Sequence, residues 1–330
     1  MNYSYFVGLD IGKKTFDASL MSLEEKEIGH KQFSNTEEGI KELLSWVSSY
    51  NLSPRNLLFC AENMGSYVTE LSLCSVELGF NLALACPLSI KSMGLQRGKN
   101  DRIDAKRIAA YAAVHHRKLG SYHLPDKELV QLRAWIIIRD NLVKQKVAVI
   151  KLQETLSSTA KLADMSSSEV FLKEHLDSLK EKIKQVELQM MEIIHTSISL
   201  SLNYKLLTSI TGVGIINAII LLCVTDNFKR FSDPRKFACY CGVAPFEHTS
   251  GTSIRGKTTT SHLANKEVKV YLTRAAITAM SWDPGIKAYY KRKTAEGKHK
   301  ASVINAIRAK IISRCFAVIR RQTPYVSIMA

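Results

Sequence analysis

The chain has 330 residues, 46% of them hydrophobic and 23% charged, a composition typical of a globular protein that excludes a disordered one. Its formal net charge is +16 at pH 7, from 46 lysines and arginines against 30 acidic residues. This excess favours a polyanionic partner, because neutralising phosphates releases condensed counterions. Nucleic acid is favoured over an acidic membrane, since no lysine-rich amphipathic anchor with Trp or Phe on its other face is evident.

No feature of the sequence predicts a membrane protein or an exported one. The longest apolar run, IINAIILLCV at 215–224, is far shorter than the roughly 18 residues of a membrane span. The first residues, MNYSYFVGLDIGKK, lack the basic region and cleavage site of a signal peptide. Of the seven cysteines only Cys239 and Cys241 lie close together, which favours reduced thiols in a cytoplasmic protein over a zinc site.

Residues 1–125 alternate between predicted strands and predicted helices. Short runs rich in aromatic and β-branched residues predict strands at 5–11, 16–22, 26–33, 56–62 and 81–87. Helical spacing predicts helices at 36–50, at 66–79 and from Asp101 to about Arg117. The pattern indicates an α/β domain with a mixed sheet, in which the opening strands are antiparallel.

Residues 126–330 are predicted to be mainly helical. Leucine, isoleucine and valine recur near every 3.5 residues around a break at 164–169, which predicts a helical hairpin or a coiled coil over 126–202. Plain bundle helices and an oligomerising coil fit this spacing equally. Within 203–330, the segment KLLTSITGVGIINAIILL predicts a helix-hairpin-helix-like turn whose Gly212 and Gly214 bring backbone N–H groups close to a phosphate. An ordinary interhelical turn is the alternative.

Four acidic residues occupy positions that predict a metal site. Asp10 and Glu62 each end an apolar strand, where a carboxylate is costly unless it is paired or bound to a cation. Asp101 and Asp104 are three residues apart and therefore share one helix face. Each acid alone is explained by a turn or a helix cap, but the four together suit Mg²⁺ or Mn²⁺ in phosphoryl transfer.

Basic residues surround these acids and recur near the C-terminus. Such clusters indicate contact with nucleic acid, although a solvated helix face is the alternative for the C-terminal group, which is interleaved with Tyr289 and Tyr290. The predicted nucleic-acid-binding side chains in these two regions are Lys13, Lys14, Arg97, Lys99, Arg102, Lys106, Arg292 and Lys293.

The four acids and their flanking residues resemble a known family. Asp10 in VGLDIGKKTFDASL, Glu62 in AENMGSY and the aspartates of KNDRIDAKRIA resemble the DEDD catalytic domain of RuvC and RNase H fold. More specifically, the chain resembles the transposases of insertion-sequence family one-ten, whose relatives include a DNA invertase. The resemblance implies a RuvC/RNase H-like catalytic domain at 1–125, a linking or oligomerising helical segment at 126–202 and a C-terminal transposase domain at 203–330.

The resemblance also assigns a nucleophile. The stretch GVAPFEHTSGTSIRGK at 242–257, where a serine beside a glycine predicts an exposed loop, is similar to a segment of the family's C-terminal domain, in which Ser250 corresponds to the nucleophilic serine. Arg255 and Lys257 are placed to stabilise charge that develops on a phosphate there. Without the resemblance, Thr252 and Ser253 are equally eligible. The chain departs from the family's pattern at His262 and Ala264, where Lys and Gly are common, but keeps Asn265.

The family implies a DNA recombinase with unusual features. These are a covalent serine–DNA intermediate, a DEDD metal cluster in one subunit that acts with the serine of another, and dimers that pair into a tetramer. An element-encoded bridge RNA, DNA partners at the element ends and the target, and a nucleoid-associated cytoplasmic location are also implied. Three alternatives remain open: a hydrolytic RuvC-type nuclease such as a junction resolvase, a site-specific invertase of the same family, and a non-catalytic nucleic-acid-binding protein.

Overall fold

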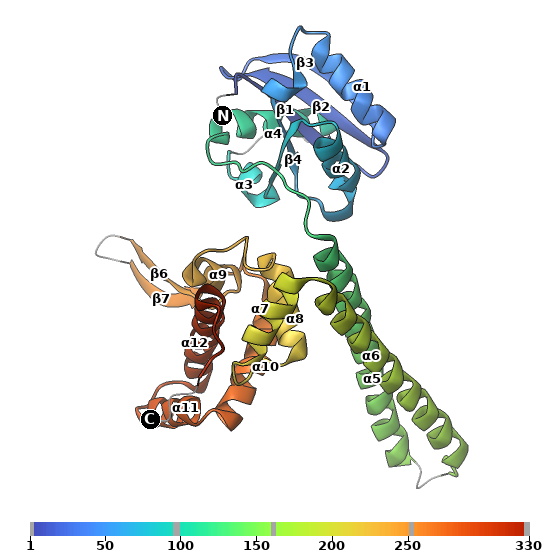
Figure 1. Ribbon diagram of the computed structural model, residues 1–330, viewed down its shortest axis with the longest axis vertical. Coiled ribbons are helices and arrows are strands. Elements are labelled where there is room, and N and C mark those ends of the chain that lie inside the picture. The colour runs from blue at the N-terminus through green and yellow to red at the C-terminus, as the bar shows by residue number, and fades with distance from the viewer. Residues whose placement is uncertain (1–2, 95–99, 160–162, 251–253, 327–330) are drawn as a thin grey trace. The chain divides into compact units, whose positions relative to one another are not determined.

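A computed structural model describes residues 3–94, 100–159, 163–250 and 254–326 of the chain (Figure 1). The fold divides into two compact units, Met1–Leu124 and Pro125–Ala330. Across the described ranges, no helix combines the length and apolarity needed to cross a membrane. The division into three domains, with a boundary after residue 202, stays a prediction.

The first unit is built on a five-stranded mixed sheet in the order β3-β2-β1-β4-β5. Strands β1 (Tyr5–Ile11), β2 (Thr15–Ser22) and β3 (Glu27–Ser34) form an antiparallel meander. Strands β4 (Leu58–Glu62) and β5 (Asn81–Ala85) add to the other edge of β1 in parallel. This arrangement confirms the predicted mixed sheet with antiparallel opening strands.

Helices cover both faces of this sheet. Strand residues such as Val7 and Leu9 pack against α1 (Glu37–Ser48) and α2 (Thr69–Glu77). The 3₁₀ turn η1 (Pro54–Asn56) lies between α1 and β4, and η2 (Gly65–Val68) directly precedes α2. The alternate residues of β1 and β4 pack on the opposite face against α4 (Asp101–His115) and the short α3 (Pro87–Lys91). The central strands β1 and β4 are therefore buried on both sides, as strands with parallel neighbours usually are.

Helix α4 lies unusually close to β1. The face that it turns to the sheet is formed largely by alanines, including Ala105, Ala109 and Ala112. A Cβ atom added to Gly8 would lie 2.2 Å from both the Ala105 carbonyl oxygen and the Ala109 nitrogen. The helix backbone thus rests directly on the strand, and this contact sets the position of the aspartates in the first turn of α4.

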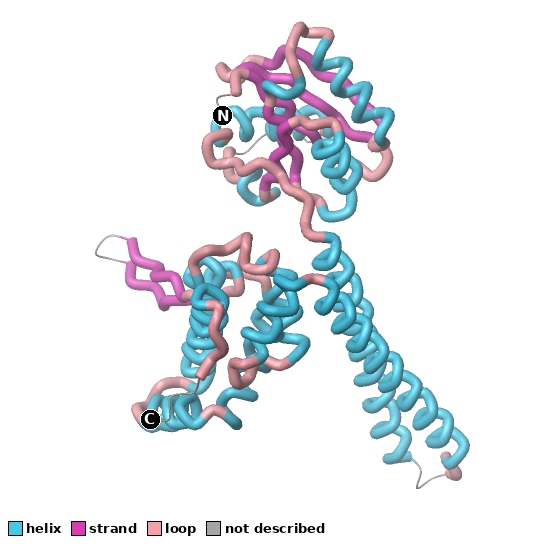
Figure 2. Tube along the Cα trace, viewed as in Figure 1, coloured by secondary structure: helices cyan, strands magenta, loops and turns pink. Residues whose placement is uncertain are grey.

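In the second unit, two long helices come first. Helices α5 (Lys127–Thr159) and α6 (Ser166–Thr196) run side by side along their length (Figure 2). Val149, Leu172 and Leu179 form a small apolar cluster between them, separate from the main core of the unit. The long helical segment predicted from the apolar spacing is confirmed.

The rest of the unit is a helical body with one β-hairpin. It comprises α7 (Ile198–Thr208), α8 (Ile215–Thr225), α9 (Pro234–Tyr240), β6 (Pro245–Ser250), β7 (Ile254–Thr260), α10 (Lys266–Trp282), α11 (Pro284–Ala295) and α12 (Lys300–Arg321). The segment that contains Ser250 was predicted to be a loop, but its flanking residues form an antiparallel hairpin. Its β-branched residues, Thr249, Ile254 and Thr258–Thr260, favour extended backbone.

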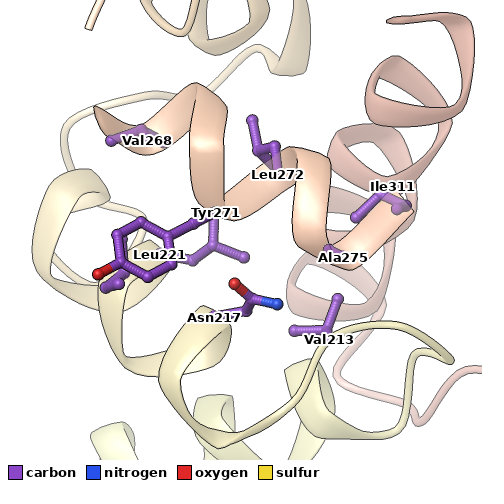
Figure 3. Close-up of a pocket in the computed structure, with 9 residues that line it drawn as sticks. Val213, Asn217, Leu221, Val268, Tyr271, Leu272, Ala275 and Ile311 are labelled. Carbon is purple, nitrogen blue, oxygen red and sulfur yellow. The ribbon is translucent and has the colours of Figure 1, made fainter. Parts of the chain in front are cut away.

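A small cavity lies among α8, α10 and α12 in the helical body. Figure 3 shows Leu221, Tyr271 and Leu272 among the side chains around it, together with Val213 from the turn before α8. Its volume of about 10 Å³ admits no more than a single water molecule. This cavity is a packing defect of the core and not a small-molecule site.

We expect Gly8→Ala to destabilise the first unit, because the new methyl group meets helix backbone and not a flexible side chain. Overpacking of this kind costs about 1–3 kcal/mol of the free energy of unfolding. Hydrogen–deuterium exchange of the peptides that cover β1 and α4 should show faster exchange than in wild type. Gly120→Ala is the matched control, since Gly120 is exposed and an added Cβ would meet nothing within 4 Å. Equal protection in the two variants would contradict the close contact.

Candidate functional site

The strand ends place Asp10 and Glu62 beside each other. In the parallel pairing of β1 with β4, Gly8 lies opposite Cys60 and Leu9 opposite Ala61. The next positions along the two strands are Asp10 and Glu62. Side chains alternate along a strand, so both acids lie on the same face as Gly8, which is the face that α4 covers.

The two aspartates of α4 lie in its first turn, but neither is the N-cap. That role belongs to Asn100, whose Oδ1 accepts a hydrogen bond of 2.8 Å from the Ile103 N–H. Asp101 and Asp104 are therefore not needed as caps, although acids in a first turn also interact favourably with the helix dipole. A carboxylate that is not consumed by capping is available for another ligand.

The four predicted acids lie within one another's electrostatic field. The pKa of Asp10 rises to about 6, first because the side chain is half-buried and then because Asp104, Asp101 and Glu62 are nearby. A like charge disfavours the ionised form of a carboxylate, and four acids together make ionisation of the most buried one costly. The fold thus gathers acids from two strands and one helix, far apart in the sequence, at one edge of the sheet.

A fifth acid belongs to this cluster and was missed in the sequence. Asp17 on β2 is paired with Asp10 across the strands, is buried, and also contributes to the raised pKa of Asp10. Its carboxylate is held by hydrogen bonds of 2.7 Å to His30 Nε2 and 2.9 Å from Gln32 Nε2. The signal was present in the sequence, because Asp17 interrupts the apolar strand FDASLMS much as Asp10 interrupts its own strand.

The donor set at this edge fits a hard divalent cation. Carboxylate oxygens are the preferred ligands of Mg²⁺ and Mn²⁺, and a cation would relieve the repulsion that raises the pKa of Asp10. In the described ranges, however, no three acidic, histidine or cysteine side chains stand close enough together to enclose an ion. Binding would require the carboxylates of Asp10, Glu62, Asp101 and Asp104 to draw closer.

Several of the predicted basic residues near the cluster have partners within the protein. Arg102 and Lys106 lie 3.9 Å and 3.1 Å from the Glu27 carboxylate. Another base on the same helix, Arg107, pairs with Asp104 at 2.8 Å. Lys13 and Lys14 are exposed in the turn that follows β1, whereas Arg97 and Lys99 lie outside the described residues. The lysine pair therefore has the most open position beside the acids.

In the second unit, Ser250 is the last residue of β6. Its register partner on β7 is Ile254, and Thr249 lies opposite Arg255. The side chains of Ser250, Arg255 and Lys257 fall outside the described part of the chain, as do Thr252 and Ser253 altogether. Ser250 and the acidic cluster belong to different compact units.

The two glycines predicted to contact phosphate differ in their surroundings. Gly212 has φ of +98°, and an added Cβ would lie 2.4 Å from the Ala275 carbonyl oxygen, so this glycine is needed for packing against α10. Gly214 is the N-cap of α8, is exposed, and has open space where a side chain would stand. Only the second position is open to an external phosphate.

Arg292 and Lys293 on α11 both interact with Glu296. The Arg292 Nε–Glu296 Oε1 distance is 3.8 Å and the Lys293 Nζ–Glu296 Oε2 distance is 2.6 Å.

Asn265, the residue at which the chain keeps the family's pattern, is the N-cap of α10. Its Oδ1 accepts a hydrogen bond of 3.1 Å from the Val268 N–H. Its amide also donates to the Tyr240 hydroxyl at 3.0 Å, which links α10 to α9.

Comparison with known proteins gives the family. A model described as a DEDD transposase of IS110 type matches residues 7–160, and a model of the IS116/IS110/IS902 transposase family matches residues 204–291. The chain belongs to the IS110 family of transposases. Transposases of this kind are enzymes that cleave and rejoin DNA.

Three relatives illustrate the range of the IS110 family. Pilin gene-inverting proteins from Moraxella lacunata and Moraxella bovis are each 27% identical over 97% of this chain and 97% of their own. An IS110 protein of unknown role from Streptomyces coelicolor is 34% identical over 37% of this chain and 30% of its own length. Among solved structures, RuvC of Thermus thermophilus bound to a Holliday junction matches 36% of this chain, at 12% identity and a TM-score of 0.29.

We expect Asp10→Asn to raise the thermal stability of the metal-free protein above pH 6. Because the folded-state pKa of Asp10 is raised, the folded wild type retains a proton that the unfolded chain has lost, and its stability falls as pH rises from about 4 to about 6. The variant avoids this loss, which is of the order of 1 kcal/mol after allowance for solvent screening. Melting temperatures at pH 4 and pH 8 in EDTA measure the effect.

Addition of Mg²⁺ at pH 8 should remove the advantage of Asp10→Asn, because a bound cation offsets the repulsion in wild type only. Glu42→Gln is the control, since it makes the same acid-to-amide change at an exposed position on α1. If the melting temperature of Asp10→Asn equalled that of Glu42→Gln at both pH values, burial and repulsion at Asp10 would not destabilise the wild type as expected.

Proposed function

We propose that this IS110-family enzyme is a DNA transposase that cuts and rejoins strands with a metal-bound DEDD cluster and the serine nucleophile Ser250. The observation that carries the proposal is the convergence of Asp10, Glu62, Asp101 and Asp104 on one face of the sheet, with which the raised pKa of Asp10 agrees. Arg107 offsets part of the charge of Asp104, but Asp10, Glu62 and Asp101 have no ion pair within the described residues. Such a set of carboxylates is costly unless it binds a divalent metal ion.

In the proposed reaction, the Ser250 hydroxyl oxygen attacks the phosphorus of the scissile phosphodiester and its proton passes to solvent or to a nearby base. A P–O bond to one deoxyribose oxygen breaks, that oxygen leaves as a hydroxyl, and the strand remains attached to the serine. Attack by the hydroxyl of another strand reverses these steps and releases the serine. Mg²⁺ or Mn²⁺, held by Asp10, Glu62, Asp101 and Asp104, would stabilise the charge on the phosphate and on the leaving oxygen.

Arg255 and Lys257 are proposed to hold the phosphate beside the serine, because cations placed where negative charge develops lower the barrier. In the strand pairing, Arg255 lies opposite Thr249, so its backbone is one position away from that of Ser250. Lys13 and Lys14, exposed at the end of β1, are proposed to bind the same DNA beside the acids. The other predicted DNA-binding cations would have to leave their carboxylate partners before they could bind a phosphate. These are Arg102, Lys106, Arg292 and Lys293.

Further features follow from the family and are proposed for this chain. They are assembly through dimers into a tetramer, a composite site in which the acids of one subunit act with Ser250 of another, and guidance by a bridge RNA. The acids and Ser250 belong to different compact units of the chain. The net charge of +16 supports large nucleic-acid partners.

A site-specific DNA invertase is the second candidate function. It is supported by the two pilin gene-inverting relatives, which match this chain over 97% of its length. Transposase and invertase would share the same cleavage chemistry and differ in the arrangement of the DNA ends. A hydrolytic nuclease is less well supported, because the second unit and its hairpin have no evident use in hydrolysis.

The test is to incubate the full-length protein with DNA that contains the element ends, with co-purifying RNA and with Mg²⁺, and then to separate the products on a denaturing gel. We expect a protein–DNA adduct that Ser250→Ala abolishes and that Asp10→Asn weakens by two orders of magnitude or more, on the order of the loss of a principal catalytic interaction. Ser253→Ala is the matched control and should keep the adduct.

Three outcomes would contradict the proposal. Cleavage that persists without an adduct in Ser250→Ala would indicate a hydrolytic nuclease. Loss of the adduct in Ser253→Ala, with Ser250→Ala unaffected, would move the nucleophile to Ser253. Binding of DNA without metal-dependent cleavage in wild type would indicate a non-catalytic protein.

A further inference from the structure

Two cations at the root of the β6/β7 hairpin have no carboxylate partner in the described part of the chain. They are Lys269 on α10 and Arg308 on α12, and both side chains are half-buried. Other partly buried arginines of this unit are compensated: Arg139 lies 2.7 Å from Glu187 and Arg314 lies 2.6 Å from Asp283. Lys269 and Arg308 depart from that pattern.

The position of Arg308 is fixed by neutral neighbours. Its Nε donates to the Thr273 hydroxyl at 3.1 Å and its Nη1 donates to Asn305 Oδ1 at 3.1 Å. The Asn305 amide donates in turn to the Val243 carbonyl at 2.7 Å, just before β6 begins. Within the described ranges no acceptor is recorded for Arg308 Nη2, so this edge of the guanidinium is available to an external ligand.

Lys269 approaches the same region from α10. Its ammonium donates to the Thr260 hydroxyl at 3.3 Å, at the last residue of β7. The ammonium lies close to the backbone that leads into β6, because a Cβ atom on Gly242 would be 3.8 Å from it, although Ala264 packs against that glycine and fills the position. Thr273, which binds Arg308, also donates to the Lys269 carbonyl at 2.6 Å and so ties the two residues together.

The electrostatics agree with this geometry. Burial lowers the pKa of Lys269, and the neighbouring Arg308 lowers it further. Burial also lowers the pKa of Arg308. Two like charges that are partly removed from water destabilise one another, and an anion bound between them would offset both costs.

We propose that Lys269 and Arg308 form a binding site for a phosphate group of the DNA strand that reaches the β6/β7 hairpin. A guanidinium edge and an ammonium together match two oxygens of a phosphodiester. DNA is the occupant because the hairpin between Val243 and Thr260 carries Ser250. The identification of DNA as the ligand therefore rests on the proposed function. The observation that Lys269 and Arg308 lack a carboxylate partner in the described chain is independent of it.

The test compares Lys269→Met with wild type in two measurements. Binding of a labelled DNA duplex should weaken by about fivefold at moderate salt, and the slope of log affinity against log salt should be shallower by about 0.9, the value for one lost phosphate contact. The free energy of unfolding should stay the same or rise, because the variant removes a repelled cation. A purely structural lysine would give the opposite result, a loss of stability with an unchanged salt slope.

Two further variants complete the set. Lys269→Arg keeps the charge and should keep most of the salt slope. Lys205→Met removes an exposed cation of α7 that has no recorded partner in the described chain, and it should leave both measurements unchanged. An equal change of slope in Lys205→Met and Lys269→Met would show a general charge effect and overturn the site.

A scan of single neutral methylphosphonates along the DNA locates the contact. One position should weaken binding of wild type and have no further effect on Lys269→Met. A loss of affinity seen with single-stranded RNA but not with DNA would overturn the DNA assignment. The Ser250 adduct separates this proposal from the proposed function. An adduct in wild type together with unchanged DNA binding by Lys269→Met would reject the phosphate site alone. Weakened DNA binding by Lys269→Met without any adduct in wild type would reject the serine mechanism alone.

Discussion

The contact between β1 and α4 is the constraint on which the candidate active site depends. Gly8 and the alanine-rich face of α4 let helix backbone lie against strand backbone, where an added Cβ would approach within 2.2 Å. Two positions further along β1 the same face carries Asp10, and one turn before Ala105 the helix carries Asp101. A bulkier contact would lift the first turn of α4 away from the strand ends and separate the acids that the fold gathers there.

Both units contain a local excess of charge of one sign. In the first unit, Asp10 is surrounded by Asp17, Glu62 and the two aspartates of α4, and its pKa rises to about 6. In the second, Lys269 and Arg308 share a site without an acid in the described chain. Such arrangements reduce the stability of the free protein, and they persist in folds because a ligand of opposite charge relieves them on binding. A metal ion and a phosphate group are the ligands that a DNA-cleaving enzyme brings together.

Neutral hydrogen bonds hold these charged groups in place. Asn100 caps α4 and so leaves Asp101 and Asp104 free of that role, while Asn265 caps α10 and links it to α9. Thr273 and Asn305 orient Arg308 without neutralising it. A charged partner in these positions would have compensated Asp101 or Arg308, as Arg107 does for Asp104.

The sequence by itself determined the mixed sheet, the long helices and the four acids, because these depend on local patterns. Apolar alternation marks a strand, 3.5-residue spacing marks a paired helix, and an acid at the end of an apolar strand is unusual enough to be noticed in Asp10 and Glu62. The hairpin at Ser250 was wrongly taken for a loop, since a glycine and several polar residues outweighed its threonines.

Only the tertiary structure decided which residues share a surface. Asp17 joins the acidic cluster through pairing with Asp10, and Gly212 packs against Ala275 more than sixty residues away, contacts that no local pattern contains. The uncompensated state of Lys269 and Arg308 is likewise a property of the folded chain, because a missing carboxylate can be recognised only after every neighbour is in place. Local propensity determines where helices and strands form, and long-range packing determines which charged side chains lie next to each of them.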